Sequence, residues 1–350
     1  MKLLYITRKI DRQDALAGFS YQWVKKIARL VDQLDVICLE RGDISDLPAN
    51  CQVYSLGKEC GKNRWREFWR FQLLAGKIVP HIDGVWTHQN PEYAILIAPW
   101  ARLFQKKLIS WYAHGAVSWK VRLMERLVNV VATSSAEGFR LASKKMLVLH
   151  QGIDTELFSF KPKTPGQLFT LVTVGRTTPS KNLEWLIDLV KDLHQLGYPQ
   201  VRLRLVGQTS RPGDDQYLRG LEQKIKQEGL ADFVEFIAAV PNIELPAVYS
   251  GADLFVNCSR TGSLDKVVLE AMACGTIVIT TNTAYRNFFH NINENLFAES
   301  YADLLNKAEI ILQLSAEDRL LLQSKLRELI VNEHNIDALI TKVVQQYKQL

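Results

Sequence analysis

The fold class is indicated most clearly by residues 169–206, FTLVTVGRTTPSKNLEWLIDLVKDLHQLGYPQVRLRLV. This stretch begins with an apolar run at Phe169–Val174, has apolar residues at helical spacing over Leu183–Leu196, and ends with a strand-like run at Val201–Val206. Short strands separated by an amphipathic helix are typical of a parallel sheet that is covered by helices. The sequence therefore predicts an α/β domain with a doubly wound parallel sheet.

The same alternation of short apolar runs and helical patterns continues to residue 280. Further strands are predicted at Val234–Ala238, Leu254–Asn257 and Thr276–Thr280, and further helices at Gln216–Gln227, Glu244–Ser250 and Lys266–Ala273. The tail from Tyr301 to Leu350 has apolar residues at helical spacing and is predicted to be helical throughout.

The first half of the chain shows the same pattern. Strands are predicted at Leu3–Thr7, Leu34–Leu39, Gln52–Ser55, Gly84–Thr87, Lys107–Tyr112, Asn129–Thr133 and Met146–His150, with helices that include Phe19–Val31 and Arg64–Ile78. The segment FKPKTPG, residues 160–166, carries two prolines and a glycine and is typical of a linker. We therefore expect two Rossmann-like domains, 1–160 and 168–334, joined by a linker at 161–167 and facing a cleft. We expect a last helix at 335–350 to cross back onto the N-terminal domain.

Charge is distributed unevenly along the chain. With 47% hydrophobic and 23% charged residues among 350, the composition excludes disordered, collagen-like and disulfide-scaffold proteins. The net charge of +6 is too weak to indicate a nucleic-acid partner. Residues 1–164 carry 25 basic and 15 acidic side chains, a net charge of +10, whereas residues 165–350 carry 18 and 22, a net charge of −4. An anionic partner is therefore expected at the N-terminal half.

The sequence indicates a cytoplasmic protein. Its five cysteines form no CxxC pair, and Cys38, Cys258 and Cys274 lie in apolar runs, as reduced core residues do. The short apolar run near the N-terminus ends at the charged residue Arg8, which favours a first strand over a signal peptide. No apolar run approaches the roughly 20 residues that span a bilayer. We expect peripheral contact with a membrane face at most.

The first candidate site is VGRTTPSKN, residues 174–182. Gly175 permits a tight turn after a strand, and Arg176 and Lys181 flank the entry to the next helix. A helix N-terminus beside two cations suits a diphosphate, because backbone N–H groups and the helix dipole favour anions. The alternative is that both cations are solvated and that Ser180 or Asn182 caps the helix.

The second candidate site is NCSRTGSLDKVVLEAMACG, residues 257–275. Small residues and a glycine follow a strand and precede a helix that contains Glu270. A carboxylate suits the two vicinal hydroxyls of a ribose, since each of its oxygens can accept a hydrogen bond. The alternative is a Lys266–Glu270 pair on a solvated helix face. The apolar neighbours of Glu270 argue against that alternative, because an embedded carboxylate is costly without a partner.

Four stretches resemble the donor-domain motifs of glycosyltransferase family 4. They are the two candidate sites described above, VPNIELPAVYSGADLFVNCSR at 240–260 and HQGID at 150–154. The resemblance is dense from Thr133 to Thr281. It is thinner before that, where Gly18, Trp86-Thr87-His88 and Ala113-His114-Gly115 carry it. It implies the GT-B fold and retaining transfer of a sugar from a nucleotide-diphosphate sugar to a glycan or lipid-linked acceptor, as in polysaccharide, lipopolysaccharide or glycolipid synthesis.

The resemblance also implies roles for individual residues. Arg176, Lys181 and His114 would form the catalytic set, the two cations by holding the donor diphosphate and His114 by facing the donor sugar from the N-terminal domain. Glu270 would bind the donor ribose. The remaining donor-side positions are Gly175, Gly262, Ser263 and Leu264, and the acceptor-side positions are Gly18 and His88. A lone histidine at a strand end is more often structural, so the roles of His88 and His114 depend on the resemblance.

One departure concerns the donor sugar. Many family members carry a glutamate eight positions before the one that matches Glu270, and here that position is Gly262. Asp265 or Ser263 is the candidate replacement for the lost contact. No Asp-x-Asp motif occurs, so we expect no metal and no cofactor, with departure of the nucleoside diphosphate leading the reaction.

The acceptor is expected to bind the basic N-terminal half. The stretch KNRWREFWRFQ, residues 62–72, interleaves four cations with aromatic residues, and Trp65, Phe68 and Trp69 share one helical face. Such a helix suits an anionic membrane surface, where each nearby cation contributes about 1 kcal/mol. The alternative is a helix that buries its aromatic residues in the N-terminal core.

Rival functions differ in what they would require. A nicotinamide dehydrogenase would carry Gly-x-Gly-x-x-Gly after the first strand, but no glycine occurs before Gly18. A GT-B-like sugar-nucleotide epimerase would share fold and donor and use no acceptor. A non-catalytic nucleotide-sugar-binding subunit, suggested by Gly262, would bind the donor without turnover.

Overall fold

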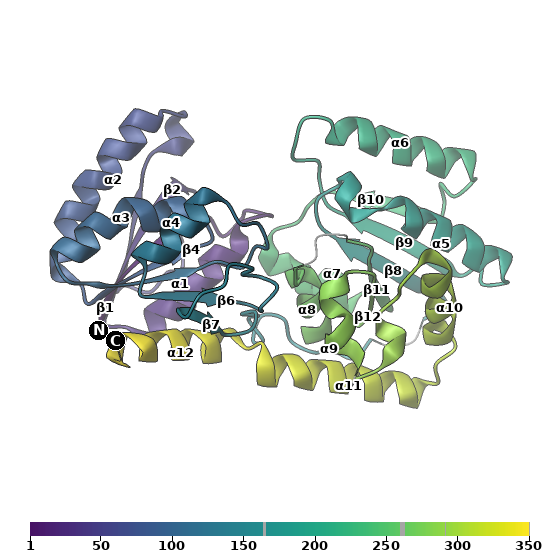
Figure 1. Ribbon diagram of the computed structural model, residues 1–350. Helices are drawn as coiled ribbons and strands as arrows, with labels where there is room; N and C mark the ends of the chain where they lie inside the picture. Colours follow the sequence, from purple (N-terminus) through teal and green to yellow (C-terminus); the bar gives the residue numbers. More distant parts are fainter. Residues whose placement is uncertain (164–165, 260–262, 291, 350) are drawn as a thin grey trace. The chain divides into compact units, whose positions relative to one another are not determined.

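The computed structural model describes residues 1–163, 166–259, 263–290 and 292–349 (Figure 1). Thr164 and Pro165 of the expected linker, and Gly262 of the expected donor site, lie outside the described residues. The chain forms two compact units. One contains Met1–Asp154, Pro241–Ile243 and Asn335–Leu350, and the other contains Thr155–Val240 and Glu244–His334.

The first unit is built on a parallel seven-stranded sheet. Its strands in sheet order are β3 (Cys51–Ser55), β2 (Gln33–Arg41), β1 (Lys2–Ile10), β4 (Gly84–His88), β5 (Lys107–Trp111), β6 (Val130–Thr133) and β7 (Met146–Val148). All neighbours pair in parallel, and β1 lies between β2 and β4. The strand order therefore reverses direction between β1 and β4, as in doubly wound folds.

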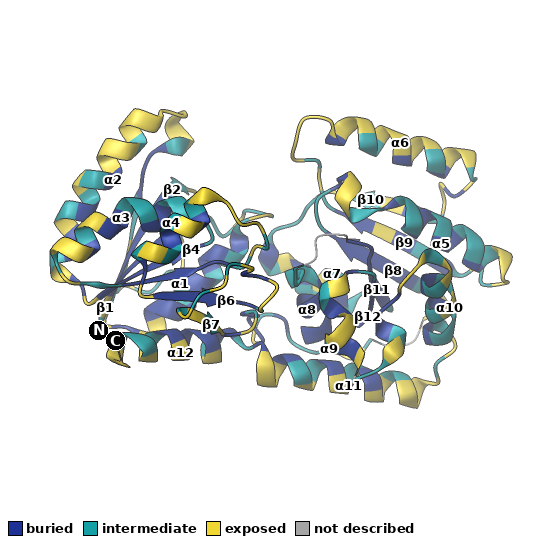
Figure 2. Cartoon of the chain, viewed as in Figure 1, coloured by how far each residue is buried: buried dark blue, intermediate teal, exposed yellow. Residues whose placement is uncertain are grey.

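Helices cover both faces of this sheet because successive strand residues are buried on opposite sides. They are α1 (Gly18–Leu30), α2 (Arg64–Ile78), α3 (Pro91–Leu103), α4 (Trp119–Leu127) and α12 (Ile336–Gln349). Tyr5 and Trp86 share a core with α1 and α12, whereas Leu4 and Val85 share another core with α2, α3 and α4. Figure 2 shows the strands buried and the outer sides of the helices exposed.

The second unit repeats the design with five parallel strands. Their sheet order is β10 (Val234–Ile237), β9 (Val201–Val206), β8 (Phe169–Val174), β11 (Leu254–Asn257) and β12 (Ile277–Thr280). The helices are α5 (Glu184–Gln195), α6 (Asp214–Gln227), α7 (Leu245–Ser250), α8 (Lys266–Ala273), α9 (Arg286–His290), α10 (Tyr301–Leu312) and α11 (Ala316–Glu333). Here the order reverses between β8 and β11.

Two details differ from the sequence prediction. The first strand continues through Arg8 and Lys9 to Ile10, because these charged residues stand at the carboxyl end of the strand, where they line a pocket. The tail is helical as predicted but is interrupted twice, since α11 begins after the cap Ser315 and α12 begins after His334 and Asn335. The cysteines are all free, and Cys38, Cys258 and Cys274 are buried as predicted. Among the described helices, none combines the length and apolarity that a bilayer span requires.

Candidate active site

The candidate donor site lies at the reversal point of the second sheet. The loop after β8 runs from Gly175 to Asn182, and the loop after β11 leads to Asp265, the residue before α8. Ligands of open α/β sheets bind outside the carboxyl ends of the strands at such a point. The two motifs found in the sequence are therefore neighbours in the fold.

Two glycines allow the loops after β8 and β9 to approach each other. Gly175 has φ +151°, a conformation that favours glycine. A Cβ atom on Gly207 would lie 1.8 Å from the carbonyl oxygen of Gly175. Sequence reasoning missed Gly207, although it follows its strand directly, as Gly175 does.

Lys181 links the two loops of the site. Its Nζ lies 3.1 Å from Oδ2 of Asp265 and 3.3 Å from the hydroxyl of Ser259. The side chains of Lys181 and Asp265 are each 14% exposed, so the pair is largely withdrawn from water. The ammonium group is thereby fixed in place at the carboxyl ends of β8 and β11.

Asp265 is also held by groups that sequence reasoning missed. The amide of Asn257 donates to its Oδ2 at 3.2 Å, and the hydroxyl of Tyr285 donates to its backbone carbonyl at 2.7 Å. Burial, with the nearby charges of Asp265 and Glu270, raises the pKa of Tyr285, which therefore stays a donor. The Asn282 amide donates to the carbonyl of Ser263 at 2.8 Å. Asp265, one candidate for the lost sugar contact, thus pairs with Lys181.

Arg176 differs from Lys181 in having no partner among the described residues. It is partly buried at the end of β8, and its guanidinium makes no hydrogen bond or ion pair within the part of the chain that the structure describes. The positive charge of Lys181 is balanced by Asp265. Arg176 therefore carries a positive charge in this loop that no described residue compensates.

The N-terminus of α5 is organised differently from the prediction. The backbone N–H of Leu183 donates to the hydroxyl of Tyr217 at 3.0 Å, and that hydroxyl donates to Glu184 at 2.6 Å. No described side chain caps α5, so capping by Ser180 or Asn182 is wrong. Since Tyr217 uses that amide and Glu184 places a negative charge in the first turn, anion binding by this loop depends on the side chains of Arg176 and Lys181.

Glu270 is buried inside α8, at 2% exposure. Its Oε2 accepts a hydrogen bond from Tyr249 at 3.2 Å, and its Oε1 lies 3.5 Å from Nζ of Lys266. The i, i+4 pair therefore exists, but the alternative of a solvated helix face is wrong. Burial, together with the charge of Glu270, raises the pKa of Tyr249 well above its ordinary value, which keeps the phenol protonated as a donor.

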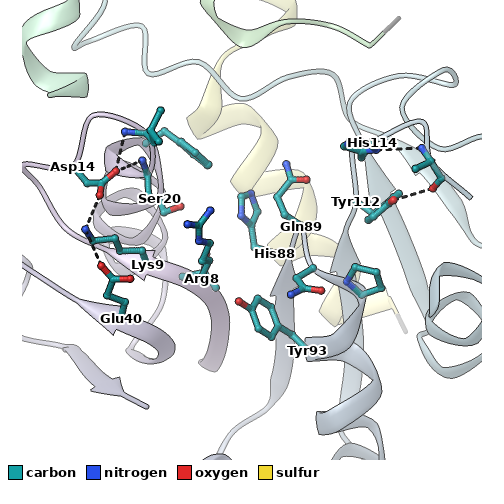
Figure 3. Close-up of a pocket in the computed structure, with 17 residues that line it drawn as sticks. Arg8, Lys9, Asp14, Ser20, Glu40, His88, Gln89, Tyr93, Tyr112 and His114 are labelled. Carbon is teal, nitrogen blue, oxygen red and sulfur yellow. Dashed lines mark hydrogen bonds and ion pairs between the residues drawn. The ribbon is translucent and has the colours of Figure 1, made fainter. Parts of the chain in front are cut away.

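The first unit has its own pocket, of about 550 Å³, at the reversal point between β1 and β4 (Figure 3). His88 and His114 both line it, and Gly18 begins α1 beside the lining residues Ala17 and Phe19. The ring of His88 is buried, and its centroid lies 4.9 Å from the ring centroid of Trp23. His114 is exposed, and its Nδ1 accepts the N–H of Ala116 at 3.2 Å, which leaves the proton on Nε2.

Residues 154–318 match the family model "Glycosyl transferases group 1". This segment is a group 1 glycosyl transferase domain.

Curated relatives of the glycosyl transferase domain include transferases and synthases that differ in substrate. Mannosylfructose-phosphate synthase from Agrobacterium fabrum is 34% identical over 113 residues, 32% of this chain and 25% of the relative. The GDP-mannose-dependent α-(1-6)-phosphatidylinositol monomannoside mannosyltransferase of Mycolicibacterium smegmatis is 27% identical over 229 residues, 57% of this chain and 58% of the relative. The chain thus spans less than two thirds of the length of these relatives.

Solved structures extend the likeness from the glycosyl transferase domain to the whole chain. Anabaena HepE in complex with UDP and glucose matches with a TM-score of 0.75 and 17% identity, covering 100% of both chains. Sucrose-phosphate synthase from Thermosynechococcus elongatus matches with a TM-score of 0.75 and 18% identity, covering 100% of this chain and 99% of the other. The fold is therefore GT-B, as the sequence predicts.

The glycosyl transferase domain brings together Gly175, Arg176, Lys181 and the end of the loop that contains Ser263 and Leu264. His114 and His88 line the pocket of the other unit, and Gly18 lies at the start of α1 in the same unit. The structure thus divides the predicted site residues into two groups, one at the reversal point of each sheet.

Proposed function

We propose that this protein is a retaining glycosyltransferase that moves a sugar from a nucleotide-diphosphate sugar to a hydroxyl of a glycan or lipid-linked acceptor, in polysaccharide, lipopolysaccharide or glycolipid synthesis. The observation that carries the proposal is the cation pair at the reversal point of the second sheet. Lys181 is fixed by Asp265 and Ser259, and Arg176 beside it is uncompensated within the described residues.

In this proposal the two cations bind the diphosphate and stabilise the negative charge that develops on the leaving nucleotide. The guanidinium of Arg176 grips two phosphate oxygens, and Lys181 acts as a point charge. Because Asp265 already holds the ammonium group, little reorganisation is needed as the charge develops. The side chains thereby supply the positive charge that a metal ion supplies in other transferases, and we propose that no metal takes part.

Glu270 is proposed to bind the donor ribose. Its Oε2 is occupied by Tyr249, whereas the contact of its Oε1 with Lys266 is long at 3.5 Å. In this proposal the carboxylate of Glu270 accepts hydrogen bonds from the ribose hydroxyls. Tyr249 orients the carboxylate from the apolar side. The backbone amides of Ser263 and Leu264 are proposed to approach the diphosphate or the sugar.

The pocket of the first unit is proposed as the acceptor site, with His88 among its lining residues and Gly18 next to the lining residues Ala17 and Phe19. His114 is proposed to act on the donor sugar through Nε2–H, since the Ala116 amide occupies Nδ1. Such a positioned donor stabilises an oxygen of the sugar during transfer.

Peripheral contact with an anionic membrane on a cytoplasmic face is proposed through α2. Trp65, Trp69 and Leu73 follow one another at i, i+4 spacing along this helix, with exposed fractions of 76%, 61% and 75%. The exposed cations Lys62, Arg64, Arg66 and Arg70 accompany them. The helix buries Phe71, Ala75 and Ile78 instead, so its largest aromatic residues remain available to a lipid surface.

The test is calorimetry with a panel of UDP-, GDP- and ADP-sugars, followed by assays of donor consumption. Arg176→Ala and Lys181→Ala should each lower turnover at least about 100-fold, since each removes a group that stabilises the transition state. Arg204→Ala, which removes an exposed cation of β9 in the same unit, is the matched control. Near-normal transfer by the Arg176→Ala/Lys181→Ala double variant would refute the assigned roles.

Two other outcomes would replace the proposal. Conversion of the nucleotide sugar without an acceptor would favour an epimerase. Tight donor binding with neither transfer nor hydrolysis would favour a non-catalytic binding subunit.

A further inference from the structure

The pocket of the first unit contains two cations in opposite situations. Nζ of Lys9 lies 2.6 Å from Asp14, 3.1 Å from Asp11 and 3.1 Å from Glu40. Burial alone would lower the pKa of Lys9, but the hydrogen bonds with these carboxylates raise it above its ordinary value. Three carboxylates thus face the one ammonium group of Lys9, and Glu40 also lies 3.6 Å from Nζ of Lys58, so Lys9 has no uncompensated charge for a ligand. Arg8, the preceding residue on β1, makes no ion pair or hydrogen bond with any described residue.

Tyr93 provides a second, independent feature of the same pocket. It stands in the first turn of α3 and is 5% exposed, and its hydroxyl makes no well-formed hydrogen bond among the described residues, although the side chain of Asn90 lies beside it. In Figure 3 the hydroxyl is directed towards the side of the pocket on which Arg8 stands. Burial raises the pKa of Tyr93 well above its ordinary value, and the smaller lowering effects of the Asn90 side chain and of the Arg8 charge do not cancel it, so the group stays protonated and able to donate. A buried hydroxyl without a partner is costly, which points to a ligand atom at this place.

The N-terminus of α3 adds a third positive element. Asn90 caps the helix by accepting the N–H of Glu92, and Asn90, Pro91 and Tyr93 all line the pocket. The positive end of the dipole of this 13-residue helix therefore faces the same space as Arg8. A cation, a phenol and a helix N-terminus converge on one pocket, at the reversal point of the sheet.

We propose that this pocket binds a phosphate group carried by the acceptor, with Arg8 and Tyr93 as its ligands. A phosphate fits better than a carboxylate because the donors stand on different elements. Arg8 can occupy two phosphate oxygens and leave a third for Tyr93, whereas a carboxylate has only two. The volume of about 550 Å³ accommodates a phosphorylated sugar or polyol. Naming this group as the acceptor rests on the proposed function, but phosphate binding itself does not.

The chemistry is shared by free phosphorylated sugars and by lipid headgroups, so the experiment has two arms. In the first, the full chain is titrated with glucose 6-phosphate, inositol 1-phosphate and glycerol 3-phosphate, each against its unphosphorylated parent. In the second, it is mixed with vesicles that contain phosphatidylinositol or phosphatidylglycerol. Binding of a soluble probe indicates a free phosphorylated acceptor. Arg8-dependent binding to vesicles alone indicates a headgroup.

If a soluble probe binds, we expect the phosphorylated compound to bind at least tenfold more tightly than its unphosphorylated parent. Arg8→Gln should lose that advantage, and Tyr93→Phe should weaken binding severalfold while keeping the buried ring. Arg122→Gln, which removes an exposed cation of α4 outside this pocket, is the matched control and should change nothing. Absence of binding in both arms, or binding that Arg8→Gln leaves intact, would overturn the inference.

The same preparations are titrated with the nucleotide that the wild type binds best. Arg8→Gln should keep wild-type nucleotide affinity, because Arg8 belongs to the first unit. Absence of phosphate binding in the wild type with intact nucleotide binding would therefore count against this inference alone. Absence of nucleotide binding in the wild type would count against the proposed function instead.

Discussion

At the residue scale, the site is built from charges whose partners come from elsewhere in the chain. Lys181 and Asp265 are 84 positions apart, and Tyr249 and Glu270 are 21 apart. Each pair fixes one functional group in a largely buried place. Arg176, a neighbouring group without a partner among the described residues, is left for the ligand. Fixed and unpaired charges therefore stand side by side, which is what preorganised binding of an anion requires.

A prediction at this scale concerns Glu270. Glu270→Gln should weaken nucleotide binding about tenfold, equivalent to about 1.4 kcal/mol, because the amide carries no negative charge for the ribose hydroxyls. Tyr249→Phe should instead cost about 1 kcal/mol of folding free energy and leave nucleotide affinity within about threefold of wild type. Calorimetry and urea unfolding separate the two effects. Unchanged affinity in Glu270→Gln would show that the ribose role is wrong.

At the element scale, glycine allows the loop after β9 to lie close to the loop after β8. Gly207→Ala should destabilise the second unit by more than about 2 kcal/mol, since its Cβ atom would lie 1.8 Å from the carbonyl oxygen of Gly175. Gly220→Ala is the matched control. Gly220 lies in α6 with nothing within 4 Å of an added Cβ, so this change should stabilise the protein by about 0.5–1 kcal/mol. Urea unfolding measures both, and equal effects would contradict the close approach.

The exposed face of α2 supports a second prediction at this scale. Trp65→Ser with Trp69→Ser should lower binding to anionic vesicles at least tenfold without lowering the melting temperature, because both side chains are exposed. Trp119→Ser, at 68% exposure on α4, is the control and should have little effect. Flotation with phosphatidylglycerol vesicles measures the binding. Equal flotation of all variants would remove the proposed membrane contact.

At the scale of the whole molecule, the last helix belongs to the first unit although it is far from the rest of that unit in sequence. Ile336, Leu339, Ile340 and Val343 share its core with Trp23, and Tyr347 donates to the carbonyl of Val85 at 2.7 Å. The chain leaves this unit at Asp154 and, apart from Pro241–Ile243, returns to it at Asn335. The first unit therefore needs both ends of the chain for its stability.

Ile340→Ala tests this arrangement. It should destabilise the first unit by about 2–5 kcal/mol, because Ile340 is fully buried. Hydrogen exchange should then accelerate in β1 and β4 and stay unchanged in β8 and β11. Lys342→Ala, an exposed position on the same helix, is the control. Faster exchange in both sheets would contradict a separate contribution of α12 to the first unit.

The parallel sheets could be predicted from the chain alone, because apolar strands and amphipathic helices are local patterns. Phe169–Val174, Lys266–Ala273 and Arg64–Ile78 have the same limits in the structure as in the prediction. Motif spacing likewise predicted Arg176, Lys181 and Glu270 as site residues, because strand ends and helix starts can be identified in the sequence.

Which charges are compensated became visible in the folded chain and not before. It pairs Lys181 with Asp265, surrounds Lys9 with three carboxylates, and leaves Arg8 without a described partner. It also buries Tyr93 in the pocket of the first unit. These facts cannot be read from local patterns because pairing depends on distances between loops that the sheet topology brings together. The strength of a charge in a binding site is set by those distances and by burial.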